Sequence, residues 1–229
     1  MARSGGGSGS GARRLAIRVK SARRRTHSST EWLQRQLNDP FVAEARRLGY
    51  RSRAAFKLIQ LDERYHLLAP GRRVVDLGCA PGGWSQVAVQ RVGPRGRVVG
   101  LDLTPTDPIA GAALLTGDFR DPATAARLRE ALGGMADLVL SDMAAPATGH
   151  AATDHLRIVA LAEEAFGFAA TILAPGGAFV AKVFQGGAEG ALLAALKRAF
   201  VEVRHAKPAA SRAESAETYV LAKGFRGGA

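Results

Sequence analysis

From residue 73 onward, short runs rich in β-branched and aliphatic residues alternate with longer stretches in which apolar residues recur at helical spacing. Such alternation is typical of an α/β fold with a mostly parallel sheet covered by helices on both faces. We therefore predict a seven-stranded sheet with strands at 73–78, 97–103, 113–116, 137–142, 177–184, 200–205 and 218–223, and helices at 84–91, 122–132, 154–173 and 188–199.

The first third of the chain follows a different pattern. Residues 1–12 are rich in Gly and Ser and residues 13–30 are basic and polar, which predicts a flexible basic arm over residues 1–28. The rest, 29–229, forms the predicted domain, with a basic helical part at 29–72 and an α/β core at 73–226. In the helical part, we expect helices from Ser29 or Thr30 to Leu37, over 41–48, and from a cap at Ser52 to about Tyr65.

The charge is unevenly distributed along the chain, which carries a formal net charge of +12. Residues 1–30 hold eight Lys and Arg and no Asp or Glu, residues 31–73 hold nine and five, and residues 74–229 hold fifteen of each. A basic segment joined to a neutral domain indicates a polyanionic partner. Nucleic acid is favoured over a membrane because the arm lacks a large apolar face. The alternative is a tail that only adds solubility.

The composition argues against several protein classes. No run of about 18 apolar residues predicts a membrane helix, and the basic N-terminus lacks the apolar stretch of a signal peptide. Cys79 is the only cysteine, which excludes an intrachain disulfide and suits a reducing cytoplasm; we expect it to be a packing residue. The five histidines are scattered without cysteine partners, so no metal site is expected.

The segment from Asp76 to Trp84 follows the first predicted core strand and opens a helix, so its glycines indicate a ligand close to the backbone. Ala80 stands where a dinucleotide G-x-G-x-x-G loop has its second glycine, and no Walker lysine follows, so a pyrophosphate is not indicated. Asp102 ends the second strand and is placed to accept from ribose hydroxyls. Asp118 follows the third strand and is placed to accept from an adenine amino group. Together these features favour a nucleoside cofactor; the alternative is an ordinary turn with capping acids.

Several motifs in order resemble the FtsJ family of ribosomal RNA 2′-O-methyltransferases, over about Ser29 to Phe225. The combination of motifs, rather than any one of them, makes the resemblance specific. They are YRSRAAFKL at 50–58, DLGCAPGGWSQ at 76–86, GDFRD at 117–121, LSDM at 140–143, AKVFQG at 181–186 and SRAESAETY at 211–219.

The resemblance implies a Rossmann-like methyltransferase fold with S-adenosylmethionine as the methyl donor. It also implies methylation of a uridine ribose 2′-hydroxyl in the A loop of large-subunit (23S) ribosomal RNA during ribosome assembly. The family's catalytic tetrad carries over to Lys57, Asp142, Lys182 and Glu217. Gly82, Trp84, Asp102, Asp118 and Asp142 match family positions that contact the donor, and Gly78 and Pro81 of the same loop are assigned to it as well.

One stretch departs from the family pattern. The family commonly reads SDMAPN, whereas this chain has an additional Ala145 before Pro146 and lacks the asparagine. This difference leaves the conformation of the loop after the fourth strand open, but it does not affect Asp142.

The chemistry explains why lysines and acids belong together in such a site. A methyl group on a sulfonium is already activated, so the enzyme has to place the hydroxyl in line and ease loss of its proton. We predict Lys182 as the base or the hydroxyl-orienting group; a base role needs its pKa lowered by roughly three units from ~10.4. Lys57 is expected to supply a neighbouring cation that lowers it, and Glu217 and Asp142 to orient the amines.

Without the resemblance, the sequence supports a functional role for these residues to different degrees. Lys182 lies in the apolar strand VAKVF, where an unpaired lysine is costly, so a functional role is favoured. Asp142 is equally compatible with a turn acid, and Trp84 with a core aromatic. For Lys57 alone a solvated helix face is the favoured interpretation, and Glu217, before a β-rich run, is by itself an ordinary residue.

Basic residues near the tetrad predict contacts to RNA phosphates. Lys57 shares one helical stripe with Arg53 and Arg64, and Arg51 precedes it, so these four residues are the predicted RNA-binding set.

Several readings of the function remain open from sequence. A tRNA is an alternative substrate, and a catalytically silent RNA-binding ribosome-assembly factor is a further alternative, although all four tetrad residues are present. A small-molecule methyltransferase is disfavoured by the basic first third, and a dehydrogenase by the lack of a G-x-G-x-x-G loop. We expect a cytoplasmic monomer that binds ribosomal RNA and has no obligate protein partner.

Overall fold

The computed structural model describes residues 37–186 and 189–227. The chain divides into two units between Ala43 and Glu44, and the sheet and the candidate site belong to the second. The predicted arm and most of the first predicted helix fall outside the described residues.

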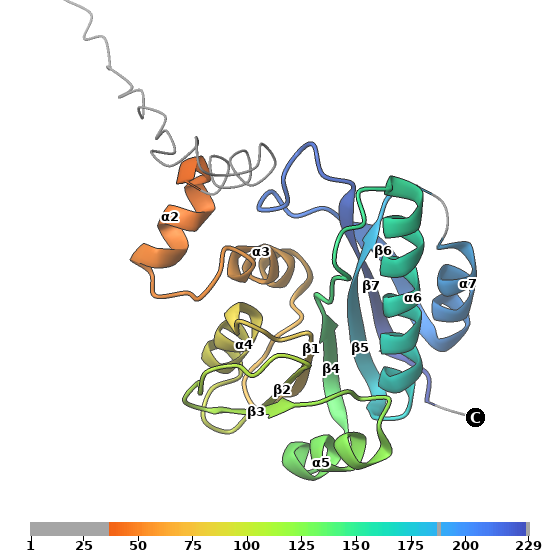
Figure 1. Cartoon of the computed structure of the whole chain (residues 1–229). Coiled ribbons are helices and arrows are strands. Elements are labelled where there is room, and N and C mark those ends of the chain that lie inside the picture. The colour runs from red at the N-terminus through yellow and green to blue at the C-terminus, as the bar shows by residue number, and fades with distance from the viewer. Residues whose placement is uncertain (1–36, 187–188, 228–229) are drawn as a thin grey trace, which may run out of the picture. The chain divides into compact units, whose positions relative to one another are not determined.

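Seven strands form one sheet in the order β3-β2-β1-β4-β5-β7-β6 (Figure 1). Neighbouring strands from β3 to β5 are parallel, and β7 runs antiparallel between β5 and β6. The predicted seven-stranded, mostly parallel sheet is confirmed. Its strands are β1 (Arg73–Leu77), β2 (Arg97–Asp102), β3 (Ala112–Thr116), β4 (Ala136–Ser141), β5 (Leu173–Phe184), β6 (Phe200–Ala206) and β7 (Glu217–Phe225).

Helices cover both faces of the sheet, as predicted. Helices α3 and α4 pack on one face, where Leu58 and Val87 join the core, and α5, α6 and α7 cover the other, where Leu128 does so. Successive residues of β1 point to opposite faces, so Val74 belongs to the first cluster and Val75 to the second. None of the helices in the described residues is both long and apolar enough to cross a membrane. The helices are α2 (Pro40–Arg47), α3 (Ala55–Tyr65), α4 (Gly83–Val92), α5 (Pro122–Leu132), α6 (Ala151–Ala170) and α7 (Gly190–Ala199).

The predicted cap at Ser52 is wrong. Helix α3 begins at Ala55, and its N-cap residue Ala54 makes no side-chain cap hydrogen bond. Ser52 contributes its carbonyl, which accepts from the Ala55 N–H at 3.2 Å. Its hydroxyl instead lies against Gly83, where a Cβ would collide with it. The Ser52 side chain therefore packs against the start of α4 instead of capping α3.

The predicted end of the helix at 173 is also wrong. Helix α6 ends at Ala170, and β5 already begins at Leu173. The carbonyl of Ile172 accepts from the N–H of Ala136 at 2.8 Å, which ties this segment to the start of β4. Pairing with the sheet therefore ends the helix earlier than its apolar pattern suggests.

Candidate active site

The loop between β1 and α4 packs closely against two neighbouring strands. Gly78 has a φ of 77°, and a Cβ there would lie 2.6 Å from Cγ of Met143, which follows β4. Only glycine combines this backbone conformation with this approach. The N–H of Gly78 donates to the carbonyl of Leu101 in β2 at 2.8 Å, and Cys79 is buried and free. The loop thus lies at the carboxyl ends of the strands, where ligands of open α/β sheets bind.

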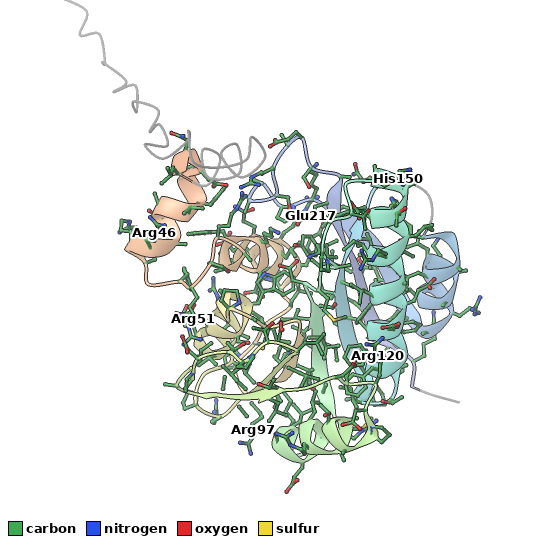
Figure 2. All side chains as sticks on the ribbon, in the orientation of Figure 1. Arg46, Arg51, Arg97, Arg120, His150 and Glu217 are labelled. Carbon is green, nitrogen blue, oxygen red and sulfur yellow. The ribbon has the colours of Figure 1, made fainter. Side chains whose placement is uncertain are left out.

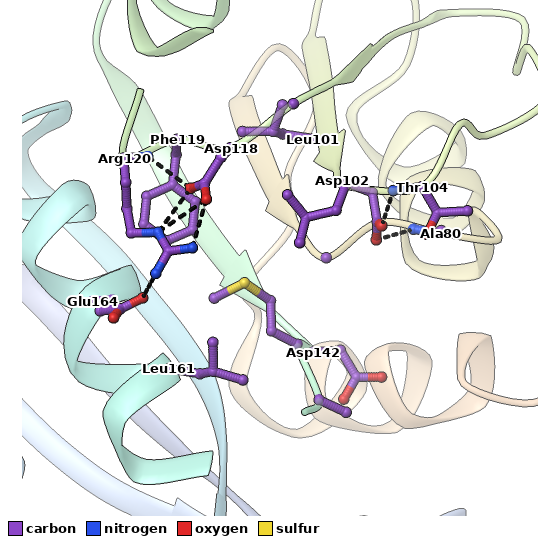
Figure 3. Close-up of a pocket in the computed structure, with 15 residues that line it drawn as sticks. Ala80, Leu101, Asp102, Thr104, Asp118, Phe119, Arg120, Asp142, Leu161 and Glu164 are labelled. Atoms are coloured by element: carbon purple, nitrogen blue, oxygen red, sulfur yellow. Dashed lines mark hydrogen bonds and ion pairs between the residues drawn. The ribbon is translucent and has the colours of Figure 1, made fainter. Parts of the chain in front are cut away.

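A cavity of about 350 Å³ opens at these strand ends (Figure 3). Residues after β1, β2, β3 and β4 line it together with α6. Its charged lining residues are four acids, Asp102, Asp118, Asp142 and Glu164, and one base, Arg120. This acidic excess disfavours a pyrophosphate and suits a ligand with a cationic group. Within residues 37–186 and 189–227, no three His, Cys, Asp or Glu side chains are grouped to hold a metal ion.

The two acids predicted to read a nucleoside lie on adjacent walls of the cavity. The carboxylate of Asp102 accepts from the N–H groups of Ala80 at 3.0 Å and Thr104 at 2.8 Å, which fixes its orientation. The carboxylate of Asp118 is paired with Arg120, and that hydrogen bond holds the pKa of Asp118 below its usual range. Both acids are therefore oriented before a ligand arrives.

The structure separates the predicted donor-binding residues into two sets. Gly78, Asp102, Asp118 and Asp142 line the cavity, and Gly82, Trp84 and Pro81 are not part of its lining. Trp84 is buried, donates from Nε1 to the carbonyl of Ala54 at 2.8 Å, and packs against Tyr219 with ring centroids 5.6 Å apart. Donor contacts by these last three residues remain a prediction.

The four predicted tetrad residues form two ion pairs. Lys57, on α3, lies 2.8 Å from Oε2 of Glu217, at the start of β7. Lys182, on β5, donates to the carbonyl of Asp142 at 2.7 Å and lies 3.3 Å from its Oδ1. All four residues are largely buried. Residues up to 160 positions apart in the sequence are thereby brought to one edge of the sheet.

Tyr219 and Ser211 join this cluster, although the sequence analysis did not select them. Tyr219 pairs with Lys182 across β5 and β7, and its hydroxyl donates to Oδ1 of Asp142 at 2.8 Å. Ser211 donates to Oε1 of Glu217 at 2.7 Å. Because side chains alternate along a strand, Tyr219 lies on the same face of β7 as Glu217, and this spacing could have identified Tyr219 from the sequence. Ser211 lies in the loop between β6 and β7, where no strand period applies.

Burial and neighbouring charges shift the pKa values of two residues in this cluster, Glu217 and Tyr219. Burial raises the pKa of Glu217, but the charge and hydrogen bond of Lys57, with Ser211 and Lys182, outweigh it, so the pKa lies below its usual range. Burial and the nearby charges of Asp142 and Glu217 raise the pKa of Tyr219 well above its ordinary value. Glu217 is therefore ionised and Tyr219 neutral at physiological pH.

The predicted RNA-binding residues differ in what they contact. The Arg51 guanidinium donates to the carbonyls of Pro81, Asp107 and Pro108, at 3.2, 2.6 and 2.7 Å, and so ties two loops together. Figure 2 shows it on the α4 side of the sheet, whereas Arg120 lies on the α6 side. Arg53 donates to the carbonyl of Ala210, and Lys57 belongs to the buried pair. Arg64 is exposed, with its guanidinium 5.2 Å from the centre of the Tyr65 ring.

Asp76, in β1 just before the cofactor loop, is fully buried. Its Oδ2 accepts from the hydroxyl of Ser85 at 2.7 Å, while its Oδ1 has no hydrogen-bond partner among the described residues. Burial, with the charges of Asp142 and Asp102, raises the pKa of Asp76 to about 7. A carboxyl whose pKa is raised by folding holds its proton longer in the folded state, so stability falls as pH rises toward the folded pKa.

Asp76→Asn is expected to gain stability relative to wild type as the pH rises from 5 to 8. Wild type should lose roughly 3 kcal/mol against the variant between these pH values, since about two pH units separate pH 5 from the folded pKa of about 7 and each corresponds to about 1.4 kcal/mol. Urea unfolding at both pH values measures the difference, with the exposed Glu163→Gln on α6 as the control. A gap between wild type and Asp76→Asn that stays constant with pH would show that Asp76 keeps an ordinary pKa.

Comparison with known proteins gives one family and several close relatives. Residues 50–225 match the FtsJ-like methyltransferase family. The chain is 64% identical over 228 residues to "Ribosomal RNA large subunit methyltransferase E" of Paramagnetospirillum magneticum, covering 97% of this chain and 93% of the relative. It is 61% identical over 221 residues to the protein of the same name from Azorhizobium caulinodans, covering 95% and 92%.

Solved structures agree with the fold. A protein of Plasmodium falciparum described as a ribosomal RNA methyltransferase matches with a TM-score of 0.71 and 32% identity, over 78% of this chain and all of that one. Fibrillarin of Aeropyrum pernix, solved with bound S-adenosyl-L-methionine, matches with a TM-score of 0.53 and 18% identity, over 76% and 75% of the two chains. The second similarity concerns the fold alone.

Proposed function

The chain belongs to the FtsJ-like methyltransferase family, and from this membership we propose that it methylates the ribose 2′-hydroxyl of a uridine in large-subunit (23S) ribosomal RNA. The methyl donor is S-adenosylmethionine. We place the uridine in the A loop, the reaction during ribosome assembly, and the enzyme in the cytoplasm as a monomer.

The observation that carries this proposal is the double role of Asp142. Its side chain lines the acidic cavity, and its carboxylate and carbonyl both hold Lys182. The nucleoside cavity and the lysine cluster therefore meet at one residue. A methyl donor and a hydroxyl acceptor have to meet in the same way, because transfer requires near-contact and alignment of the reacting atoms.

The cavity suits S-adenosylmethionine in its charge and in the placement of its acceptor groups. The donor supplies an activated methyl group on a sulfonium centre, and the four acids of the lining complement that positive charge. Asp102 and Asp118 stand where ribose hydroxyls and an adenine amine can donate to them. Gly78 lets the loop pack directly against Met143, and both residues line the cavity.

Lys182 is the residue that acts on the target hydroxyl in this proposal. Its Nζ donates one hydrogen bond to the carbonyl of Asp142 and lies 3.3 Å from the Oδ1 of the same residue, which forms the ion pair. As an ammonium, Lys182 can orient the ribose 2′-oxygen by donating an N–H to it; as a neutral amine, after losing one proton to solvent, it can take the proton of the 2′-hydroxyl. Tyr219, which donates to Asp142, fixes the carboxylate that holds Lys182.

The pair of Lys57 and Glu217 supports the target from the α3 side. Lys57 Nζ lies 5.9 Å from the centre of the Tyr219 ring, so the two ion pairs flank one aromatic side chain. A lysine held by a buried carboxylate keeps a fixed position from which to bind a ribose or phosphate oxygen. We therefore assign this pair to placing the target nucleotide.

Transfer of tritium from labelled S-adenosylmethionine tests the proposal. The acceptors are ribosomal subunits from a strain lacking this gene, free ribosomal RNA and bulk tRNA, with Lys182→Ala as the control enzyme. We expect label on large-subunit RNA at an alkali-resistant linkage. Label on tRNA alone would keep the chemistry and change the substrate. No label despite donor binding would favour a silent assembly factor.

Binding to RNA is expected to weaken steeply with salt, and deleting residues 1–28 should make that dependence shallower. Each phosphate contact contributes about 0.7 to the slope of log affinity against log salt for single strands, so we expect a decrease of at least about two. Filter binding at several salt concentrations measures it. An unchanged slope would place the binding surface outside the arm, with Arg64→Gln as the next variant.

A further inference from the structure

Arg120 lies between two carboxylates at the wall of the cavity (Figure 3). Its Nη2 is 2.6 Å from Oδ2 of Asp118, and its Nε is 3.0 Å from Oδ1 and from Oδ2. Its backbone N–H donates to Oδ1 at 2.9 Å. On the other side, its Nη1 is 3.5 Å from Oε2 of Glu164, on α6. The guanidinium is thus held by groups from two different parts of the fold.

These contacts leave limited room on the Asp118 carboxylate. A carboxylate offers about four acceptor sites. The backbone N–H, Nε–H and Nη2–H of Arg120 fill three of them. About one site remains, and the fork geometry of a guanidinium fixes where it points. A carboxylate prepared in this way accepts from a single N–H donor and repels a carbonyl oxygen at the same place.

The turn that carries both residues is itself fixed to the sheet. The Gly117 N–H donates to the carbonyl of Asp102 at 2.9 Å, and the Asp121 N–H to the carbonyl of Asp118 at 3.1 Å. Phe119 packs against Phe168 of α6 with ring centroids 5.3 Å apart. The direction of the remaining acceptor site is therefore set relative to Asp102, on the neighbouring strand.

We propose that Arg120 is a positioning residue for base recognition: it holds Asp118 so that its remaining acceptor site receives the exocyclic amine of the donor's adenine. The inference rests on the proposed function, because it requires a nucleoside methyl donor in the cavity. Glu164 steadies the far side of the guanidinium and has a smaller effect.

A purely structural role explains the arrangement less well. The side chain of Arg120 is 60% exposed, and ion pairs in such positions contribute little to stability. The pair instead faces a cavity, and the hydrogen bond from Arg120, which also lowers the pKa of Asp118, fixes the direction of its carboxylate there. We therefore expect loss of the Arg120–Asp118 pair to change ligand selectivity more than the stability of the fold.

The test compares two ligands that differ only at the position that Asp118 would read. S-adenosylhomocysteine carries an amine at position 6 of its purine, and its 6-deamino analogue, which has unsubstituted purine as its base, carries a hydrogen there. Both have the same net charge, so the ratio of their affinities cancels the effect of changing the charge of the cavity. Calorimetry measures both affinities for wild type, Arg120→Gln, Arg120→Lys and Glu164→Gln. Arg127→Gln, an exposed arginine of α5 outside the cavity lining, is the matched control.

We expect wild type to prefer the amine-bearing ligand by about 100-fold, since a site that pairs a buried hydrogen-bond donor rejects a ligand lacking it. Arg120→Gln should lower this ratio to below about tenfold. Arg120→Lys should do the same, because an ammonium keeps the charge but not the fork. Arg127→Gln and Glu164→Gln should stay within about threefold of wild type, and thermal melting should show all four variants folded.

Three results would overturn the inference. A wild-type ratio in Arg120→Gln would mean that Asp118 is oriented without Arg120, and the proposed methyl transfer would stand. Equal binding of both ligands by wild type would mean that the amine is not read at all. Failure of wild type to bind either ligand would overturn the proposed function together with this inference.

Discussion

Lys182→Ala is expected to lower the rate of methyl transfer by about three orders of magnitude. Proton transfer by a positioned side chain contributes typically about 10²–10⁴-fold, and Lys182 is the cation held at the junction of cavity and cluster. The affinity for S-adenosylmethionine should stay within about threefold, because Asp142 remains in the cavity lining. Single-turnover transfer to the RNA, with donor affinity from calorimetry, measures both quantities.

Two further variants sharpen this expectation. Lys182→Met fills nearly the same volume, so it separates loss of the amine from loss of packing around a residue that is 8% exposed. Lys182→Arg keeps a cation that cannot give up its proton, and partial activity there would favour an orienting role over a base role. The exposed Lys197→Met on α7 is the control. A Lys182→Ala enzyme that bound donor and RNA and still transferred methyl near the wild-type rate would contradict the assignment.

Glu217→Gln and Lys57→Met are each expected to slow transfer by about 100-fold, and the double variant should be little slower than either. The two side chains form one ion pair at 2.8 Å and are 15% and 12% exposed, so removing either one releases the other. Groups that act as a unit give strongly non-additive effects. A double-mutant cycle on single-turnover rates measures this. Losses that multiply would show that the two residues act independently.

The same pair predicts a pH dependence of stability. The folded-state pKa of Glu217 is depressed, so its contribution is complete above the unfolded pKa of about 4.3 and is lost as pH falls through the folded pKa. Glu217→Gln should remove this acid-side loss and should destabilise the protein by about 2 kcal/mol at neutral pH, since it leaves Lys57 without its partner. Urea unfolding between pH 3 and pH 7 measures both effects.

The family assignment and the fold follow from sequence because both rest on local patterns. Strands such as Arg97–Asp102 appear as short β-branched runs, and Gly78 marks a turn that no side chain allows. The ordered motifs around Lys57 and Lys182 are likewise readable one after another. Periodicity and glycine reflect burial and backbone freedom at the residue itself, so they need no knowledge of distant partners.

Local sequence patterns could not predict the long-range contacts that complete the site. The link from Tyr219 to Asp142 spans 77 positions, and that from Lys57 to Glu217 spans 160. Arg51, predicted from its charge to meet phosphate, uses its guanidinium on three backbone carbonyls. The hydroxyl of Ser52, which was predicted to cap α3, packs against Gly83 instead. In each case the partner is distant in the sequence and is set by how strands, helices and loops pack together.

By itself, the sequence determined the α/β class, the strand positions and the basic first third, and it predicted the residues of the tetrad, since composition, period and motif are properties of the chain. Tertiary structure alone decided that Asp142 is shared by the cavity and Lys182, and that Arg120 stands between Asp118 and Glu164. The physical reason is that a hydrogen bond or an ion pair depends on distances of a few ångströms. Those distances are set only when β7 inserts beside β5 and α6 packs over the sheet.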